Sequence, residues 1–228
     1  MNEQTCSVHD VTKTARNLVS YGATLGQKFG FDSITKNKFS LQIATFSNWV
    51  IKEVHEGTLS AWEGMQALLA EHEALRAKAW FYTKNGIGVA AGALQIKAGI
   101  AITGATAGAA VVPGAFLMGH GANNMYEGGM NIYNGPNAPS AEGPMKTLYQ
   151  KAMGDVYKGN MAYYSADLGL SAISMGWLVR KPGSVQLFRR DSKNYEMTYK
   201  QTGTLALFFE AVVDGLTINS MCAEVNPN

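Results

Sequence analysis

The stretch that decides the fold is Asn85–Ala141, which begins NGIGVAAGALQIKAGIAITGATAGAAVVPGAFLMGHGANN. Its 57 residues carry two formal charges, Lys97 and Glu127. A helix on the surface of a soluble protein needs one polar face, whereas a helix that crosses a membrane does not. The flanking segments carry charged and amide side chains at ordinary density. We therefore expect a protein that first dissolves in water and later meets a lipid bilayer.

Two apolar arms are predicted within this stretch. Gly86–Thr103 has one charge and, as a helix, a length of about 27 Å, which is close to the roughly 30 Å hydrocarbon core of a bilayer. Gly104–Gly108 is a plausible reversal, and Ala109–Tyr126 forms the second arm. Pro113 either lies in the first turn of that helix or kinks it. The simplest object is a glycine-rich apolar helical hairpin.

Glycine spacing gives this hairpin two readings. Gly88 and Gly92, and again Gly104 and Gly108, stand four residues apart, a spacing that lets helix backbones approach closely in lipid. The alternative is a buried glycine-rich hairpin inside a soluble helical protein. Lys97 is compatible with both, because a lysine can snorkel to a membrane interface or point into solvent.

The remainder of the chain also predicts helices. Ser60 precedes Glu63 by three residues, which is the capping-box pattern of a helix start. We expect an all-α helical bundle that shelters the hairpin, in a single domain over residues 1–228, with an amphipathic helical part at 1–84 and a glycine-rich apolar part at 85–221. The other expected segments are the helices Val11–Leu25, Ser33–Val54, Trp62–Lys84, Met145–Lys158, Met161–Val179 and Thr204–Met221, and a polar connection over Gln186–Lys200.

Composition excludes several function classes. The chain of 228 residues has a formal net charge of +2 and no dense block of Lys and Arg, so nucleic acid is not an expected partner. Cys6 and Cys222 either pair or remain two reduced thiols, and neither stands in a metal-binding spacing. We expect no metal and no cofactor.

The first residues, MNEQTCSVHDVTKTARNLVSYGATLG, lack a basic region followed by an apolar region and a small-residue cleavage site. We therefore expect no cleaved general-secretory signal peptide. Export would then need a dedicated machine.

A polar stripe crosses the second arm. His120, Asn124 and Glu127 are four and three residues apart, so they lie on one face of a continuous helix. Three interpretations remain open: a structural hydrogen-bonded network, a water-lined ion path, or catalysis with His120 as base and Glu127 as orienting carboxylate. Asp167, the one charge in Met161–Val179, must also pair, face water or stay out of lipid.

One further pattern carries a resemblance to a known family. Its residues are PGAFLMGHGANNMYEGGMN at 113–131, then Glu142–Pro144, Tyr149–Gln150, Asp167–Ser171 and Leu187–Arg189. Over about Lys84 to Met221 the chain resembles a bacterial domain-of-unknown-function family that includes antibacterial effectors of type VI secretion systems.

The resemblance implies a toxin that enters a rival bacterium and depolarises its cytoplasmic membrane. It implies no catalytic residues. It also implies a cognate immunity protein and a component of the secretion machinery as partners. The protein would be cytoplasmic in the producer, would be secreted without a cleaved signal peptide and would act at the inner membrane of the target. Our own expectation is that the two arms insert into the bilayer and that several copies associate to form one conducting path. The alternatives are a soluble enzyme that uses the His120 face and a non-toxic helical adaptor. The candidate residues for insertion or for the polar stripe are Gly88, Gly92, Lys97, Gly104, Gly108, Pro113, His120, Asn124, Glu127 and Asp167.

Overall fold

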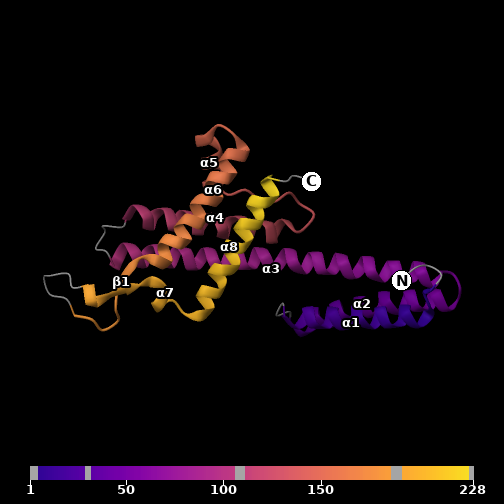
Figure 1. Ribbon diagram of the computed structural model, residues 1–228. Helices are drawn as coiled ribbons and strands as arrows, with labels where there is room; N and C mark the ends of the chain where they lie inside the picture. The colour runs from indigo at the N-terminus through magenta and orange to yellow at the C-terminus, as the bar shows by residue number, and fades with distance from the viewer. Residues whose placement is uncertain (1–4, 29–31, 106–110, 186–191, 226–228) are drawn as a thin grey trace. The chain divides into compact units, whose positions relative to one another are not determined.

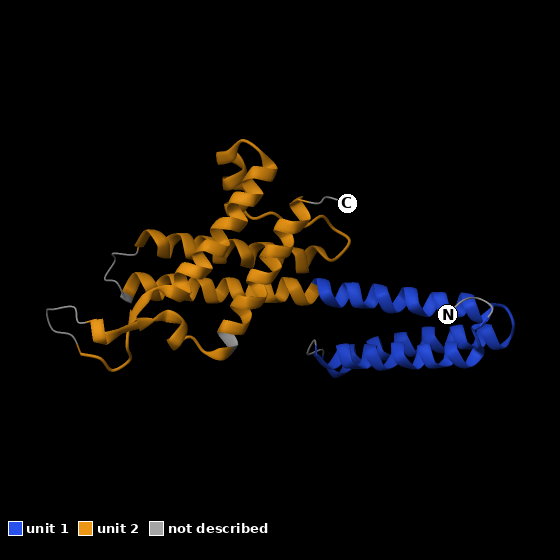
Figure 2. Cartoon of the chain, in the orientation of Figure 1, with its two compact units in different colours: residues 1–81 blue, residues 82–228 orange. Residues whose placement is uncertain are grey.

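The computed structural model describes residues 5–28, 32–105, 111–185 and 192–225. Most of them are helical, and the predicted all-α class is confirmed (Figure 1). The chain divides into two compact units, unit 1 over Met1–Phe81 and unit 2 over Tyr82–Asn228 (Figure 2). This division falls close to the expected change of character at Lys84. A single domain over the whole chain stays a prediction.

Unit 1 has an aliphatic core. It contains α1 (Val8–Lys28), α2 (Ser33–His55) and the first part of α3 (Ala61–Ala105). The Asp32 side chain caps α2 by accepting hydrogen bonds from the backbone N–H groups of Ile34 and Thr35, both at 3.0 Å. The buried residues of the core are Val11, Ala15, Leu18, Val50, Val54, Met65 and Leu68.

Helix α3 begins at the predicted capping box. The Ser60 N–H donates to a carboxylate oxygen of Glu63 at 2.8 Å, and the Glu63 N–H donates to the Ser60 hydroxyl at 3.1 Å. The expectation that a helix ends near Lys84 was wrong, because α3 continues without interruption to Ala105. The glycines after Lys84 do not stop the helix, since proline is absent there and the close packing described next compensates for their low helix propensity.

In unit 2 the second half of α3 packs antiparallel on α4 (Val111–Asn134) along a seam of small residues. A Cβ atom at Gly92 would collide with the Gly121 carbonyl oxygen, and one at Gly99 would lie 2.6 Å from that of Gly114. A Cβ atom at Gly128 would lie 2.6 Å from the carbonyl oxygen of Asn85. Only glycine permits the two backbones to approach this closely.

Pro113 is the third residue of α4, so it lies in the first turn, where its missing N–H costs no intrahelical hydrogen bond. The predicted reversal at Gly104–Gly108 falls partly on residues 106–110, which lie outside the described residues. The glycine-rich hairpin as a whole therefore stays a prediction.

The boundary between the helices expected over Met145–Lys158 and Met161–Val179 lies earlier in the chain than predicted. Helix α5 (Pro144–Met153) ends at Gly154, whose φ of 64° is left-handed, and α6 (Val156–Gly176) follows. The Asp155 side chain caps α6 by accepting from the Lys158 N–H at 2.7 Å. The Gly154–Asp155 pair was the signal for this break, and α6 replaces the apolar segment expected over Met161–Val179.

A short β-ribbon follows α6. Its first strand lies at the end of the helix expected over Met161–Val179, and its second strand lies within the polar connection expected over Gln186–Lys200. Strand β1 (Leu178–Arg180) pairs antiparallel with β2 (Tyr195–Met197), with Val179 opposite Glu196. Residues 186–191 of the expected connection lie outside the described residues. The remaining described elements are the 3-10 helix η2 (Ser192–Asn194), α7 (Thr198–Gln201) and α8 (Thr204–Val225). Cys6 and Cys222 are both free thiols.

Candidate functional site: a buried polar network in unit 2

The centre of unit 2 is a buried pair formed by His120 of α4 and Asp167 of α6. The ring atom Nδ1 of His120 lies 3.2 Å from Oδ1 of Asp167, and the exposed fractions of the two side chains are 0% and 4%. An ionised carboxylate only accepts, so a hydrogen bond to that form of Asp167 requires the proton on Nδ1. The other ring nitrogen of His120, Nε2, lies 3.3 Å from the hydroxyl oxygen of Tyr149 on α5.

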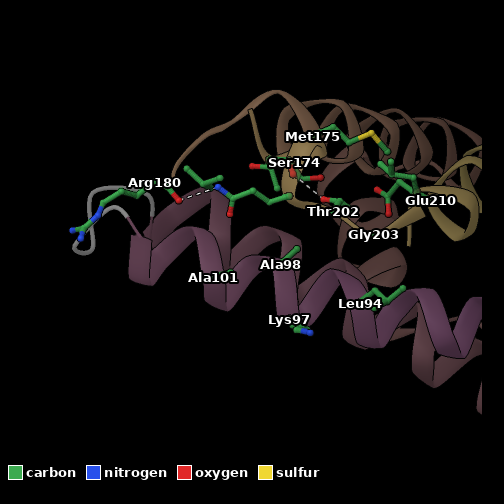
Figure 3. Close-up of a pocket in the computed structure, with 14 residues that line it drawn as sticks. Leu94, Lys97, Ala98, Ala101, Ser174, Met175, Arg180, Thr202, Gly203 and Glu210 are labelled. Carbon is green, nitrogen blue, oxygen red and sulfur yellow. Dashed lines mark hydrogen bonds between the residues drawn. The ribbon is translucent and has the colours of Figure 1, made fainter. Parts of the chain in front are cut away.

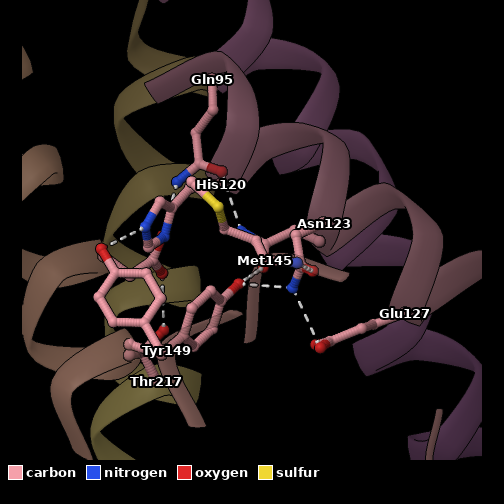
Figure 4. A network of polar contacts seen from close by, with 10 residues as sticks. Gln95, His120, Asn123, Glu127, Met145, Tyr149 and Thr217 are labelled. Atoms are coloured by element: carbon pink, nitrogen blue, oxygen red, sulfur yellow. Dashed lines mark hydrogen bonds and ion pairs between the residues drawn. The ribbon is translucent and has the colours of Figure 1, made fainter. Parts of the chain in front are cut away.

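Two further helices supply donors to Asp167. The Gln95 side chain of α3 donates to Oδ1 at 3.3 Å, and the Thr217 hydroxyl of α8 donates to Oδ2 at 3.3 Å. Figure 4 shows the side chains of Gln95, Tyr149 and Thr217 lying around His120. This pair therefore joins α3, α4, α5, α6 and α8 through directional contacts.

Aromatic rings enclose the imidazole. The Tyr163 ring is stacked on His120, with centroids 4.8 Å apart and an interplanar angle of 6°. Tyr149 meets His120 edge-on at 5.7 Å. His120 is thus sealed from solvent on both its ring face and its edge.

A chain of hydrogen bonds through the amide side chains of Asn123 and Asn124, here called the amide relay, extends the network along α4. Asn124 donates to the Gln95 side-chain oxygen at 2.9 Å and accepts from the Tyr163 hydroxyl at 3.0 Å. The same hydroxyl accepts from Asn123 at 2.9 Å, and Asn123 in turn accepts from the backbone N–H of Met145 at 2.9 Å. Every side chain in this relay has a polar partner, as a buried network requires.

Glu127 ends the relay near the start of α5. One carboxylate oxygen accepts from the Gly143 N–H at 2.7 Å and from Asn123 at 3.0 Å. Burial raises the pKa of Glu127 above its ordinary value, against the opposing effect of these hydrogen bonds and of Lys146. Glu127 thus holds the entry to α5 against α4.

Lys146 compensates part of the negative charge nearby. Its ammonium lies 3.3 Å from Glu142 and 5.3 Å from the centroid of the Tyr164 ring. Burial alone would lower the pKa of Lys146, but Tyr164 and the carboxylates of Glu127 and Glu142 together raise it.

Two further acidic side chains of α8, Glu210 and Asp214, lie near α6. The Ser171 hydroxyl donates to Asp214 at 3.0 Å. Burial raises the pKa values of both Glu210 and Asp214, and the charge of Asp167 raises them further. Within the part of the chain that the structure describes, no group of three or more His, Cys, Asp or Glu side chains is arranged to hold a metal ion.

The predicted stripe residues have separate partners. His120 pairs with Asp167 rather than with Glu127, Asn124 faces α3, and Glu127 faces the start of α5. Asp167, expected to pair, face water or stay out of lipid, is paired, because its carboxylate contacts Gln95, His120 and Thr217. The hydrogen bonds of this network hold α3, α4, α5, α6 and α8 together, and the imidazole of His120 is buried.

The predicted glycine and lysine candidates behave differently from one another. Gly92 lies in the tight seam, whereas a Cβ atom at Gly88 would make only ordinary contact, 3.9 Å from the Asn124 carbonyl oxygen, and one at Gly104 would meet open space. Lys97 is exposed. Gly108 lies outside the described residues.

Sequence reasoning missed most partners of the stripe. These partners come from four other helices. Gln95, Tyr163 and Thr217 had as their signal only a polar group within an apolar segment, and Tyr149 was part of the resemblance without an assigned contact. The seam left a clearer signal, because Gly114, Gly121 and Gly128 repeat every seven residues.

A separate pocket of about 520 Å³ lies between α3, α6, α8 and the β-ribbon (Figure 3). Its wall is largely apolar, with Leu94, Ala98 and Leu207 among the lining residues. Glu210 also lines it, while the Arg180 side chain turns away from it in Figure 3. None of the residues His120, Asn124 and Asp167 lines this pocket.

These features define an all-α protein whose second unit is organised around a buried polar network. A model of the family described as "Protein of unknown function (DUF4225)" matches residues 51–203, and the chain belongs to this family. The match starts within α2, earlier than the resemblance at Lys84 predicted, and ends before α8. No curated protein and no solved structure matches the chain.

Proposed function

We propose that the protein is an antibacterial toxin that inserts into the cytoplasmic membrane of a rival bacterium and depolarises it as an ion-conducting pore. The proposal includes the partners that the family resemblance implies, namely a cognate immunity protein and a component of a type VI secretion machinery. It also includes storage in the cytoplasm of the producer and self-association on insertion.

The observation that carries the proposal is the character of α3. Among the described residues, Ala61–Gly104 is the one helical stretch long and apolar enough, by length and composition, to cross a membrane. Only 28% of its most apolar window is buried. A core helix of a soluble protein would hide such a window, because apolar surface is driven out of water. The exposed apolar surface of α3 therefore favours a later transfer into lipid.

The α3–α4 seam supports the same proposal. Its contacts depend on shape and close backbone approach, which remain favourable in lipid, where the hydrophobic effect no longer holds helices together. The two arms can therefore stay paired as they leave water.

The experiment measures the potential across vesicles loaded with a potential-sensitive dye. We expect the purified protein to dissipate an imposed potential. The variant Ala93→Asp places a charge at an exposed position of α3, so the fold in water should tolerate the substitution. Inserting this aspartate into the bilayer costs about 3 kcal/mol, which should lower the depolarising activity by about two orders of magnitude.

Ala152→Asp is the matched control, because Ala152 is an exposed alanine of α5, outside both arms. It should retain full activity, and thermal unfolding should show both variants to be folded. Vesicles that stay polarised at every dose and pH would refute the pore and leave the enzyme or adaptor alternatives. Equal activity of Ala93→Asp and wild type would exclude α3 as the inserting helix.

A further inference from the structure

We propose that the β-ribbon and the described residues beside it, 178–185 and 192–200, form a docking surface for the anionic face of a lipid bilayer. The inference rests on the proposed action at a membrane, but it concerns the first contact with lipid rather than insertion. It assigns this role to a part of unit 2 that is separate from both the polar network and the α3–α4 seam.

The first observation is charge. Residues 178–185 and 192–200 together contain four Lys and Arg against one acid, a net charge of +3, in a chain whose total is +2. The rest of the chain therefore carries −1. A cation near an anionic membrane surface contributes about 1 kcal/mol of attraction. The ribbon is consequently the part of the chain that an anionic surface attracts most strongly.

The second observation is exposed apolar surface among these cations. The exposed fraction is 84% for Val185, 47% for Leu178, 45% for Met197 and 42% for Tyr199. The Lys200 ammonium lies 6.0 Å from the centroid of the Tyr199 ring. Cations interleaved with aliphatic and aromatic side chains match the boundary between headgroups and acyl chains. A nucleic acid would use the cations but would offer nothing to the aliphatic side chains.

The third observation is that the described backbone of this surface is held in place. The Arg180 guanidinium donates to the carbonyl oxygen of Ser184 at 2.6 Å, and the Lys181 N–H donates to the carbonyl oxygen of Asn194 at 2.8 Å. The Gln201 side chain donates to the carbonyl oxygen of Arg180 at 2.9 Å. The cations and apolar side chains are thus presented from a fixed turn and strand pair, which lowers the entropy lost on docking.

The test is sedimentation of the full-length protein with vesicles of phosphatidylcholine alone and of phosphatidylcholine mixed with phosphatidylglycerol. We expect binding to the mixed vesicles, weakened by added salt, and little binding to phosphatidylcholine. The double variant Lys181→Gln/Lys200→Gln should bind the mixed vesicles about 30-fold more weakly, at about fivefold per lysine, and should lose part of the salt dependence.

Two further variants separate this surface from general charge. Lys151→Gln/Lys158→Gln removes the same charge from exposed positions of α5 and α6 and should bind like wild type. Val185→Ser should weaken binding by about tenfold while keeping the salt dependence of wild type. Thermal unfolding of each variant shows that the fold is retained.

The outcomes distinguish this inference from the proposed function. If both lysine pairs weaken binding equally, or if neutral vesicles bind as well as anionic ones, the docking surface is refuted, whether or not the vesicles lose their potential. If the ribbon variants lose binding as expected but wild type never dissipates the potential, the docking surface stands and the pore is refuted.

Discussion

The two units of this chain bury different kinds of side chain. Among the described residues, unit 1 buries eight hydrophobic side chains and one polar one, whereas unit 2 buries five hydrophobic and nine polar ones. Burial of aliphatic groups is non-directional, so unit 1 should tolerate small changes of packing. A buried polar network stabilises only when its members are all paired. Unit 2 is therefore the unit in which one substitution should release several helices together.

The largest expected effect is at the centre of that network. Asp167→Ala would remove the acceptor shared by His120, Gln95 and Thr217, and breaking a buried pair in this way costs about 3–5 kcal/mol. Hydrogen exchange by mass spectrometry should show faster exchange in α4, α6 and α8 together. Asp167→Asn, which keeps one acceptor oxygen, should cost less. Loss of protection confined to α6 would contradict a shared network.

A core substitution in unit 1 should have a somewhat smaller and more local effect. Leu18→Ala removes a fully buried side chain and should cost about 2–4 kcal/mol. We expect faster exchange in α1 and α2, with protection of α6 and α8 unchanged. If exchange in unit 2 increased equally, the division into two independently stabilised units would be wrong.

The glycine seam gives a matched pair within one helix. Gly92→Ala would force a Cβ atom against the Gly121 backbone and should cost about 1–3 kcal/mol, measured by urea unfolding. At Gly86 a Cβ atom meets nothing within 4 Å, so Gly86→Ala should instead stabilise α3 by up to about 1 kcal/mol. Equal effects of the two substitutions would show that the seam is not closely packed.

The smallest expected effect is an opposite response of the two units to acid. Burial raises the pKa values of Glu127, Glu210 and Asp214 in unit 2, so these groups bind protons more readily in the folded than in the unfolded state. Unit 2 should therefore gain stability as the pH falls from about 7 to about 5. The acids of unit 1 whose pKa values are lowered by hydrogen bonds from helix-start residues are Asp10, Asp32 and Glu63.

Those three groups stabilise unit 1 above their ordinary pKa values of 3.8 to 4.5, and this contribution is lost as the pH falls through the lowered values. Unit 1 should accordingly stay constant between about pH 7 and pH 5 and weaken below about pH 4. Hydrogen exchange corrected for intrinsic rates measures both responses. Glu210→Gln should remove part of the gain in unit 2, and a loss of stability in unit 2 on mild acidification would overturn the assignment.

Local signals predicted the parts of the fold that depend on local physics. The Ser60–Glu63 box gave the start of α3, and the apolar spacing gave α2 from its first residue, Ser33. The absence of a helix end at Lys84 was not predicted, because the glycines that follow it are stabilised by α4, a contact that no local pattern reveals. The β-ribbon was missed for a similar reason, since each of its strands is three residues long.

The candidate site was predictable in its members and not in its connections. Periodicity placed His120, Asn124 and Glu127 on one helix, and the cost of burying a charge indicated that Asp167 needs a partner. Asp167 pairs with His120 because α4 packs beside α6, and this tertiary contact leaves no local pattern in the sequence. The amides and hydroxyls that complete the network lie on α3, α5 and α8, far away in sequence.

The two thiols provide built-in reporters for future spectroscopy. The Cys6 thiol donates to the Ala61 carbonyl oxygen at 3.3 Å, and both burial and the Asp10 carboxylate raise its pKa, so it should react slowly with a maleimide dye. Cys222 on α8 is exposed and should be labelled first. One fluorophore on each unit can thus be attached in sequence to the unmodified chain, and the emission of each then reports on its own unit.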